Sequence, residues 1–139
     1  MSDGANSVAR ARRAVEARWA HDAAARELGM ALETVEPDTA TVSMLVGADL
    51  VNGHDICHGG FILTLAETAL MLACHTDARE HDVQGTQITF IAPGRRGMRL
   101  LAQAHARHRG ERNAIWDVSV RTETGEAIAE VRGHTRRTG

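Results

Sequence analysis

The chain has 139 residues, enough for one domain, and 43% of them are hydrophobic, which supplies a core and argues against a disordered chain. Its formal net charge is −2, and only 3% of its residues are aromatic, with no tyrosine. Nucleic-acid binding is therefore disfavoured, because it needs a positive surface and aromatic side chains for base stacking. All 16 basic residues are arginines.

The first expected element is a helix over residues 7–28, where helix-forming residues dominate and apolar side chains recur near helical spacing. Gly29 is expected to end it. The arginines of this segment most simply form its solvated face, with an anionic-ligand site as the alternative. We treat residues 1–29 as an N-terminal helical segment and residues 30–137 as the main domain.

Short strands account for most of the remaining chain. Residues 30–46 predict two strands around a Glu-Pro-Asp-Thr turn at 36–39. Residues 86–92 alternate in the manner of a strand and end at a Pro-Gly pair. Three further strands are predicted from apolar alternation, over residues 98–106, 114–120 and 127–131.

Between these strands lies the longest apolar run, residues 61–74, which is shorter than the roughly 20 residues that span a bilayer. We interpret it as a buried helix, although it contains Glu67, whose charge is costly in an apolar setting unless it is paired or used. One apolar helix among about six antiparallel strands predicts an α+β fold with a curved sheet wrapped around the helix.

The segment that opens this helix contains Asn52-Gly53-His54, then Cys57-His58-Gly59-Gly60-Phe61, then Leu65-Ala66-Glu67-Thr68-Ala69. His-Gly-Gly alone is a weak motif, but here an Asn lies six residues before the His and an acid nine residues after it. With the downstream strands at 88–93 and 117–120, this pattern resembles the signature of hotdog-fold acyl-CoA thioesterases of the PaaI-like (phenylacetyl-CoA thioesterase) group. The resemblance covers about residues 30–136.

The resemblance implies a hotdog fold and hydrolysis of an acyl-CoA thioester, often an aryl-acyl one, without metal or other cofactor. It also implies active sites at dimer interfaces, often within a homotetramer, and a role in phenylacetate degradation. Glu67 takes the position of the helix carboxylate, as general base or direct nucleophile. PaaI-like proteins usually have Asp there, while some aryl-CoA thioesterases of this fold use Glu, so the departure bears on the substrate more than on the activity.

Elementary chemistry supports this assignment. Gly59 and Gly60 fall at a predicted helix start, where unpaired N–H groups and the positive end of the helix dipole can polarise a carbonyl oxygen. His58 and Asn52 are expected to orient water or the thioester. His58 and Glu67 are nine residues apart, about 13.5 Å along a helix and about 180° around it, so we expect one site to combine residues of two chains.

Structural roles for the same residues remain open. Glu67 could lie at a helix boundary or pair with an arginine, and His58 could cap the helix. Asn52-Gly53 is also a good turn dipeptide, and the two glycines could simply allow tight packing. Thr68, beside Glu67 in the motif, is predicted to contact the substrate.

Arginines in predicted loops are the candidates for binding the CoA phosphates: Arg95, Arg96 and Arg109, with Arg107 and Arg112 nearby. The alternative is that these exposed arginines only solubilise the protein. Cys57 and Cys74 each precede a histidine, but sequence neighbours point in different directions and the spacing matches no zinc pattern, so no metal is predicted. The N-terminus lacks a continuous apolar signal region, and we expect a cytoplasmic protein with reduced thiols.

Two competing functions are compatible with the fold. One is a hotdog hydratase or dehydratase, which typically presents a His followed by Phe-Pro and a Pro-Gly helix start; neither feature precedes Gly59. The other is a non-catalytic regulator that binds acyl-CoA. A chain that lacked the acid or the His-Gly-Gly motif would favour this function, but this chain has the acid and the motif.

Overall fold

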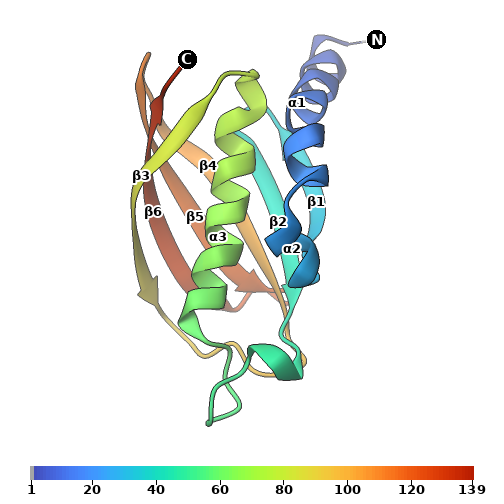
Figure 1. The fold of residues 1–139 in the computed structure, drawn as a ribbon, viewed down its shortest axis with the longest axis vertical. Coiled ribbons are helices and arrows are strands. Elements are labelled where there is room, and N and C mark those ends of the chain that lie inside the picture. Colours follow the sequence, from blue (N-terminus) through green and yellow to red (C-terminus); the bar gives the residue numbers. More distant parts are fainter. Residues whose placement is uncertain (1) are drawn as a thin grey trace.

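The computed structural model describes residues 2–139, which form an antiparallel sheet wrapped around a long helix (Figure 1). The strands are β1 (Ala31–Glu36), β2 (Thr39–Leu45), β3 (His81–Phe90), β4 (Arg99–Arg109), β5 (Asn113–Thr122) and β6 (Ala127–Arg137). The helices are α1 (Asp3–Ala20), α2 (Ala23–Glu27) and α3 (Gly59–Cys74), with 3-10 turns η1 (Ala48–Leu50) and η2 (His75–Asp77). The strand order is β1-β2-β4-β5-β6-β3, which confirms the predicted α+β arrangement.

Two strands are longer than their sequence patterns predict. β3 begins at His81 rather than at residue 86, and β6 continues to Arg137 rather than ending near residue 131. In β6 the inward positions beyond Val131 are Gly133 and Thr135, which break the apolar alternation although they are buried. In β3 a register shift between Val83 and Gly85 interrupts the pattern.

α3 lies against the concave face of the sheet because most of its circumference is apolar, as in its fully buried Leu65 and Leu70. The strands opposite it carry small residues that let the helix approach closely. Ala102 and Ala104 face inward on β4, and on β6 a Cβ added at Gly133 would lie 2.1 Å from Cδ1 of Leu70. The position of α3 is thus fixed by close packing against β4 and β6.

The N-terminal segment is two helices, so the prediction of one continuous helix over residues 7–28 is wrong. α1 ends at Ala20 and α2 starts at Ala23. Asp22 caps α2, because its carboxylate accepts a hydrogen bond from the N–H of Ala25 at 3.0 Å. α1 packs against β1 and η2 and buries Ala11 and Val15 in the common core.

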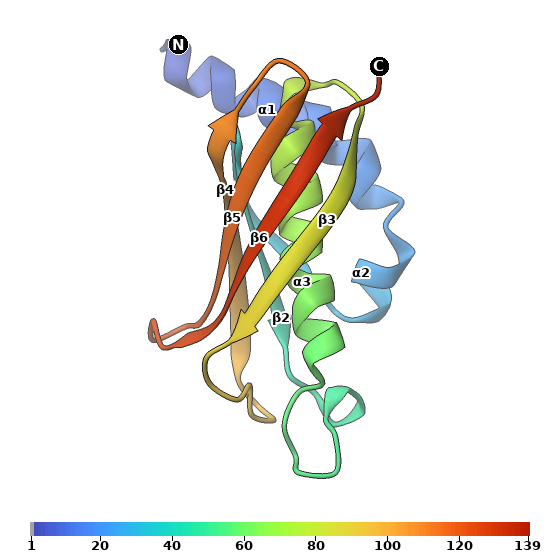
Figure 2. The same cartoon turned by 90° about the vertical axis from the view of Figure 1, so that its left-hand side faces the viewer.

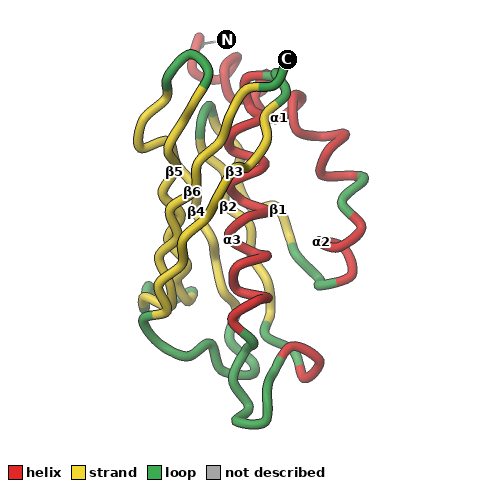
Figure 3. The backbone as a smooth tube through the Cα atoms, turned by 60° about the vertical axis from the view of Figure 1, so that its left-hand side comes forward, coloured by secondary structure: helices red, strands yellow, loops and turns green. Residues whose placement is uncertain are grey.

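The sheet, α3 and the α1–α2 segment lie in succession when the molecule is viewed along the sheet (Figures 2 and 3). One helical stretch, Gly59–Asp77, is long and apolar enough to cross a membrane by length and composition alone, and half of that window is buried inside the protein. The loop between β2 and α3 (residues 46–58) projects from the end of the molecule at which α3 begins, and the chain termini lie at the other end (Figure 1).

Candidate active site

The loop that leads into α3 is held in place by Asn52. Its side-chain oxygen accepts hydrogen bonds from the N–H groups of His54 at 2.9 Å and Ile56 at 3.3 Å, and its own N–H donates to the carbonyl of Ile56. Asp55 completes the turn with a positive φ of 62°. The Asn52 oxygen is therefore used within the loop, and the side-chain NH₂ is the group that a ligand can engage.

His58 immediately precedes α3 and has an exposed side chain. Its backbone N–H donates to the carbonyl of Leu50 at 2.9 Å, which fixes the residue while its ring makes no capping hydrogen bond. The ring lies edge-on to Phe61, with centroids 6.3 Å apart. His58 is thus positioned through its backbone, and its imidazole faces outward at the start of the helix.

Gly59 and Gly60 supply the first two N–H groups of α3, and neither has a hydrogen-bond partner within residues 2–139. The ring of Phe90 lies over Gly59: an added Cβ would be 2.6 Å from Cζ of the ring, so a larger residue here would have to displace the phenyl group. The space around the Cα of Gly60 is open. Two free amides at the positive end of a 16-residue helix have the chemistry that a developing oxyanion would need as hydrogen-bond donors.

Glu67 lies in the middle of α3, half-buried, beside a cavity of about 300 Å³. The cavity is lined by Arg18 and Asp22 from the N-terminal segment, and by Thr64, Thr68 and other residues of α3. The Glu67 carboxylate has no hydrogen bond or ion pair to any other residue in the described range 2–139. In the described part of the protomer, therefore, Glu67 neither lies at a helix boundary nor pairs with an arginine.

Thr68 is nearly buried, and its hydroxyl donates to the carbonyl of Thr64 at 2.7 Å. It lines the same cavity as Glu67. Its hydroxyl proton is already used within the helix, so a substrate would meet its methyl group or the remaining lone pair of its oxygen.

Two of the predicted CoA ligands, Arg95 and Arg96, lie in the loop between β3 and β4, close to the start of α3. This loop contacts the β2–α3 loop through a bridge between Ile56 and Arg95 and a 2.7 Å hydrogen bond from the N–H of Cys57 to the carbonyl of Gly94. Arg96 pairs with Asp55 through Nε at 2.8 Å, and both side chains are more than half exposed. The pair contributes little to stability and leaves its guanidinium accessible.

Arg109 lies at the other end of α3. Its guanidinium pairs with Asp77, lies 3.4 Å from the carboxylate of Asp38, and stacks 5.2 Å from the ring centroid of Trp116. These contacts tie Arg109 into the fold, and the protomer does not bring it together with Arg95 and Arg96.

Sequence reasoning missed two groups of residues near the site. Phe90 and Ile91 are about half exposed beside Gly59 and line a mainly apolar cavity of about 370 Å³. Arg18, treated as part of a solvated face, lines the Glu67 cavity. The alternating pattern at 86–92 predicted a strand, but it does not show which side chains near the strand end remain exposed. Likewise, the helical pattern of the N-terminal segment does not show which part of the protein α1 packs against.

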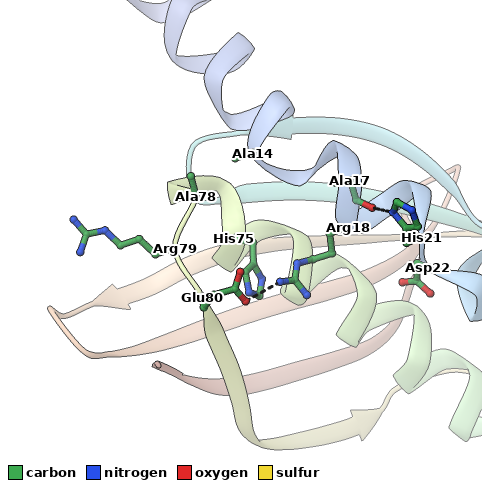
Figure 4. A pocket seen from close by; sticks show the side chains of 9 residues that line it. All are labelled: Ala14, Ala17, Arg18, His21, Asp22, His75, Ala78, Arg79 and Glu80. Carbon is green, nitrogen blue, oxygen red and sulfur yellow. Dashed lines mark hydrogen bonds and ion pairs between the residues drawn. The ribbon is translucent and has the colours of Figure 1, made fainter. Parts of the chain in front are cut away.

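Arg18 also borders a second, adjoining cavity of about 590 Å³ between α1 and the end of α3, and it pairs there with Glu80 at 3.3 Å (Figure 4). His75 is buried in its wall. Burial lowers the pKa of His75, whose Nδ1 donates to the carbonyl of Met71 at 2.7 Å while Nε2 accepts from the N–H of His81. Both ring nitrogens are used, as befits a neutral structural histidine.

The two cysteines are free and buried. Burial raises the pKa of Cys57, and raises that of Cys74 to about 12, so neither thiol is an activated nucleophile. Across residues 2–139, no group of three or more His, Cys, Asp or Glu side chains is placed to hold a metal ion.

Comparison with known proteins gives the family context. The profile of the Thioesterase superfamily matches residues 54–129. The chain is 33% identical over 123 residues to the acyl-coenzyme A thioesterase PaaI of Escherichia coli (strain K12), covering 88% of each. The structure of the E. coli PaaI protein from the phenylacetic acid degradation operon matches with a TM-score of 0.93 and 32% identity over 96% of both chains. The phenylacetic acid degradation protein PaaI from Thermus thermophilus matches with a TM-score of 0.81 and 29% identity, over 84% of this chain and 100% of that one. The predicted hotdog fold is confirmed.

Proposed function

The chain belongs to the PaaI-like acyl-CoA thioesterases of the thioesterase superfamily, and from that premise we propose that its substrate is an aryl-acyl-CoA such as phenylacetyl-CoA or hydroxybenzoyl-CoA. The products are the free acid and CoA. The observation that carries thioester hydrolysis is the presence on one helix of two free glycine amides at its start and an unpaired carboxylate beside a cavity, while the aryl-acyl group is taken from the phenylacetic acid pathway named for the relatives.

In the proposed reaction the thioester carbonyl oxygen accepts hydrogen bonds from the N–H groups of Gly59 and Gly60. Glu67 either takes a proton from water as the water attacks the carbonyl carbon, or attacks that carbon itself. The tetrahedral oxyanion then collapses and the C–S bond breaks. If water attacked, the proton taken by Glu67 passes to the sulfur and CoA leaves as the thiol. If Glu67 attacked, CoA leaves as the thiolate, and a water molecule then cleaves the mixed anhydride, which releases the free acid, restores the Glu67 carboxylate and supplies the proton that converts the thiolate to the thiol. His58 and the NH₂ group of Asn52 orient the thioester or the water. No step requires a metal.

One protomer cannot bring these groups to one carbonyl. Glu67 lies about two and a half turns along the helix from the level of His58, which is about 13.5 Å. We therefore propose that Glu67 of one subunit faces Asn52, His58, Gly59 and Gly60 of another, in a dimer with two shared sites that pairs further into a homotetramer.

The proposed CoA path begins at the exposed loops beside Gly59. Arg95 and Arg96 offer charge-assisted hydrogen bonds to the CoA phosphates, Arg96 by releasing its solvent-exposed pair with Asp55. The acyl group lies against Thr68 and the cavity beside Glu67. We propose a cytoplasmic enzyme that acts in phenylacetate degradation, by analogy with the degradation operon named for E. coli PaaI.

The test is free-thiol release from phenylacetyl-CoA, hydroxybenzoyl-CoA and a medium-chain acyl-CoA by wild type, Glu67→Gln, Glu67→Asp and Glu16→Gln. Glu16 is an exposed carboxylate on α1 outside the cavities and serves as the matched control. Loss of a general base lowers kcat by about 10²–10⁴, so Glu67→Gln should lose at least that much while Glu16→Gln keeps wild-type turnover. Turnover highest on the medium-chain ester would overturn the aryl-acyl assignment, and full activity of Glu67→Gln would overturn the role of Glu67.

The shared site has its own test, by mixing subunits of Glu67→Gln and His58→Ala after dissociation and reassembly. In a mixed dimer one site combines both substitutions and the other combines neither, so activity should reappear. Sites built within single chains would stay inactive in every mixture, which would refute the two-chain arrangement.

A further inference from the structure

A second cationic site lies at the end of the molecule opposite the start of α3. Four arginines line one cavity of about 210 Å³ there. They come from separate parts of the chain: Arg79 before β3, Arg109 at the end of β4, Arg112 in the β4–β5 turn and Arg137 at the end of β6. The N–H of Arg137 donates to the carbonyl of Arg112 at 2.7 Å, which holds the β6 end against the turn.

Two of these guanidinium groups carry buried donors that the protein does not satisfy. Nη1 of Arg109 and Nε of Arg137 are buried and have no hydrogen-bond partner in the described part of the chain, residues 2–139. The nearest counter-charge to Nη1 of Arg109 is Asp38, at an ion-pair distance of 3.4 Å that is long for a hydrogen bond. A buried charged donor left unpaired is costly, so an acceptor in the adjoining cavity that draws these two guanidinium groups toward it would relieve that cost.

The carboxylates near the cavity balance only part of its positive charge. Asp77 is already committed: its oxygens accept from Nε2 of His81 at 2.9 Å and 3.0 Å, from the N–H of Arg79 at 2.9 Å, and from Arg109. Glu111 is exposed and pairs with none of residues 2–139. Four guanidinium groups thus line the cavity against two carboxylates, Asp77 and Glu111, while Asp38 adds a third counter-charge at Arg109. Arg79 also extends away from His75 and Glu80 rather than pairing with them (Figure 4).

We propose that this cavity binds a phosphate-type oxyanion, held by the guanidinium groups of Arg137, Arg112 and Arg79, beside that of Arg109. Planar guanidinium forks match the oxygens of a phosphate group, and the cavity holds several water-sized groups of about 30 Å³ each. The phosphate is either carried by the CoA nucleotide or is free in solution. The site is separate from Gly59 and Glu67, and its existence does not depend on the proposed substrate.

The test measures binding of inorganic phosphate to the full-length protein by calorimetry and thermal shift, with chloride at matched ionic strength as the reference. Arg137→Gln is the test variant. Arg136→Gln is the matched control, because Arg136 is the neighbouring exposed arginine and does not line the cavity. We expect saturable stabilisation by phosphate that is at least tenfold weaker in Arg137→Gln and unchanged in Arg136→Gln.

The source of the phosphate is separated by comparing CoA with 3′-dephospho-CoA. If removing the 3′-phosphate weakens binding to wild type but not to Arg137→Gln, the CoA nucleotide is the ligand. If CoA and 3′-dephospho-CoA bind alike while inorganic phosphate still binds, the ligand is a free anion. The proposal is overturned if phosphate stabilises no more than chloride, or if both arginine variants respond alike. None of these outcomes uses turnover, so they are independent of the thioesterase assays.

Discussion

Gly133→Ala tests how closely α3 is packed against the sheet. Its added Cβ would lie 2.1 Å from Cδ1 and 3.5 Å from Cγ of Leu70, and 3.7 Å from Cγ2 of Thr86. Since carbon atoms meet at about 3.5–4.0 Å, the first contact is too short by about 1.5 Å. Leu70 is fully buried, so its side chain cannot turn into solvent to relieve the overlap.

The expected cost follows from two opposing effects. Overpacking a well-packed core costs about 1–3 kcal/mol. Replacing a glycine recovers about 0.4–1 kcal/mol by restricting the unfolded chain. We expect the free energy of unfolding to fall by about 1–2 kcal/mol, with a melting temperature lower by a few degrees. Gly85→Ala is the control, because no atom lies within 4 Å of its added Cβ.

Urea unfolding at one fixed protein concentration measures the effect, and a double-mutant cycle with Leu70→Ala assigns it. Leu70→Ala alone should cost about 2–5 kcal/mol, because it leaves a cavity. The new methyl of Gly133→Ala should partly fill that cavity, so the double variant should be more stable than the sum of the single effects predicts. Strict additivity, or an equal loss in Gly85→Ala, would refute the close contact between α3 and β6.

Two further predictions concern a buried hydrogen bond and an ion-paired carboxylate. The indole N–H of Trp116 donates to Oγ1 of the fully buried Thr135 at 2.9 Å, and Thr135→Val removes this acceptor. Thermal unfolding should show that the protein is less stable by about 1–3 kcal/mol. The control is Ser119→Ala, at a half-buried position on β5, which should lower stability by less; equal losses in the two variants would contradict this account. The pKa of Asp77 lies below 3.8, since hydrogen bonds from the N–H of Arg79 and from His81, with the charge of Arg109, outweigh the burial that opposes its ionisation. Its contribution to stability is therefore present above pH 3.8 and is lost as the pH falls through the lower folded-state pKa. The stability gap between wild type and Asp77→Asn should be largest near neutral pH and should shrink on acidification below that value, whereas a gap that stays constant from pH 7 to pH 3 would show that the Asp77 charge is not responsible.

The elements that could be predicted from the sequence are those whose apolar residues recur at a regular helical or strand spacing. The apolar helix and the alternating strands of β4 and β5 bury one face each, so their pattern is visible in the sequence. The sequence pattern predicts too early an end for β6, because its inward positions beyond Val131 are not apolar. Gly133 allows the close approach of α3, and Thr135 accepts a hydrogen bond from Trp116. The break between α1 and α2 did have a signal, the N-cap Asp22, inside an otherwise continuous run of helix formers.

The candidate site divides in the same way. The free amides of Gly59 and Gly60 follow from a local motif at a helix start, which a sequence can display. The ring of Phe90 over Gly59 and the approach of Arg18 to the Glu67 cavity join segments that lie far apart in the chain, and no local pattern encodes them. Arg109 is a case in which the sequence pattern suggested too little structure. The pattern placed it in a loop, whereas its guanidinium group is held by ion pairs with Asp38 and Asp77.

The placement of the chain ends bears on how the protein can be handled. Both ends of the described chain lie away from the loop that carries His58 (Figures 1 and 2). A protein immobilised through either end would therefore present the start of α3 to the solution. The two sides are not equivalent, however, because a segment fused after residue 139 would begin only two positions beyond Arg137. An affinity tag on that side would crowd the cationic cavity, so phosphate titrations call for a tag at the N-terminus or for its removal.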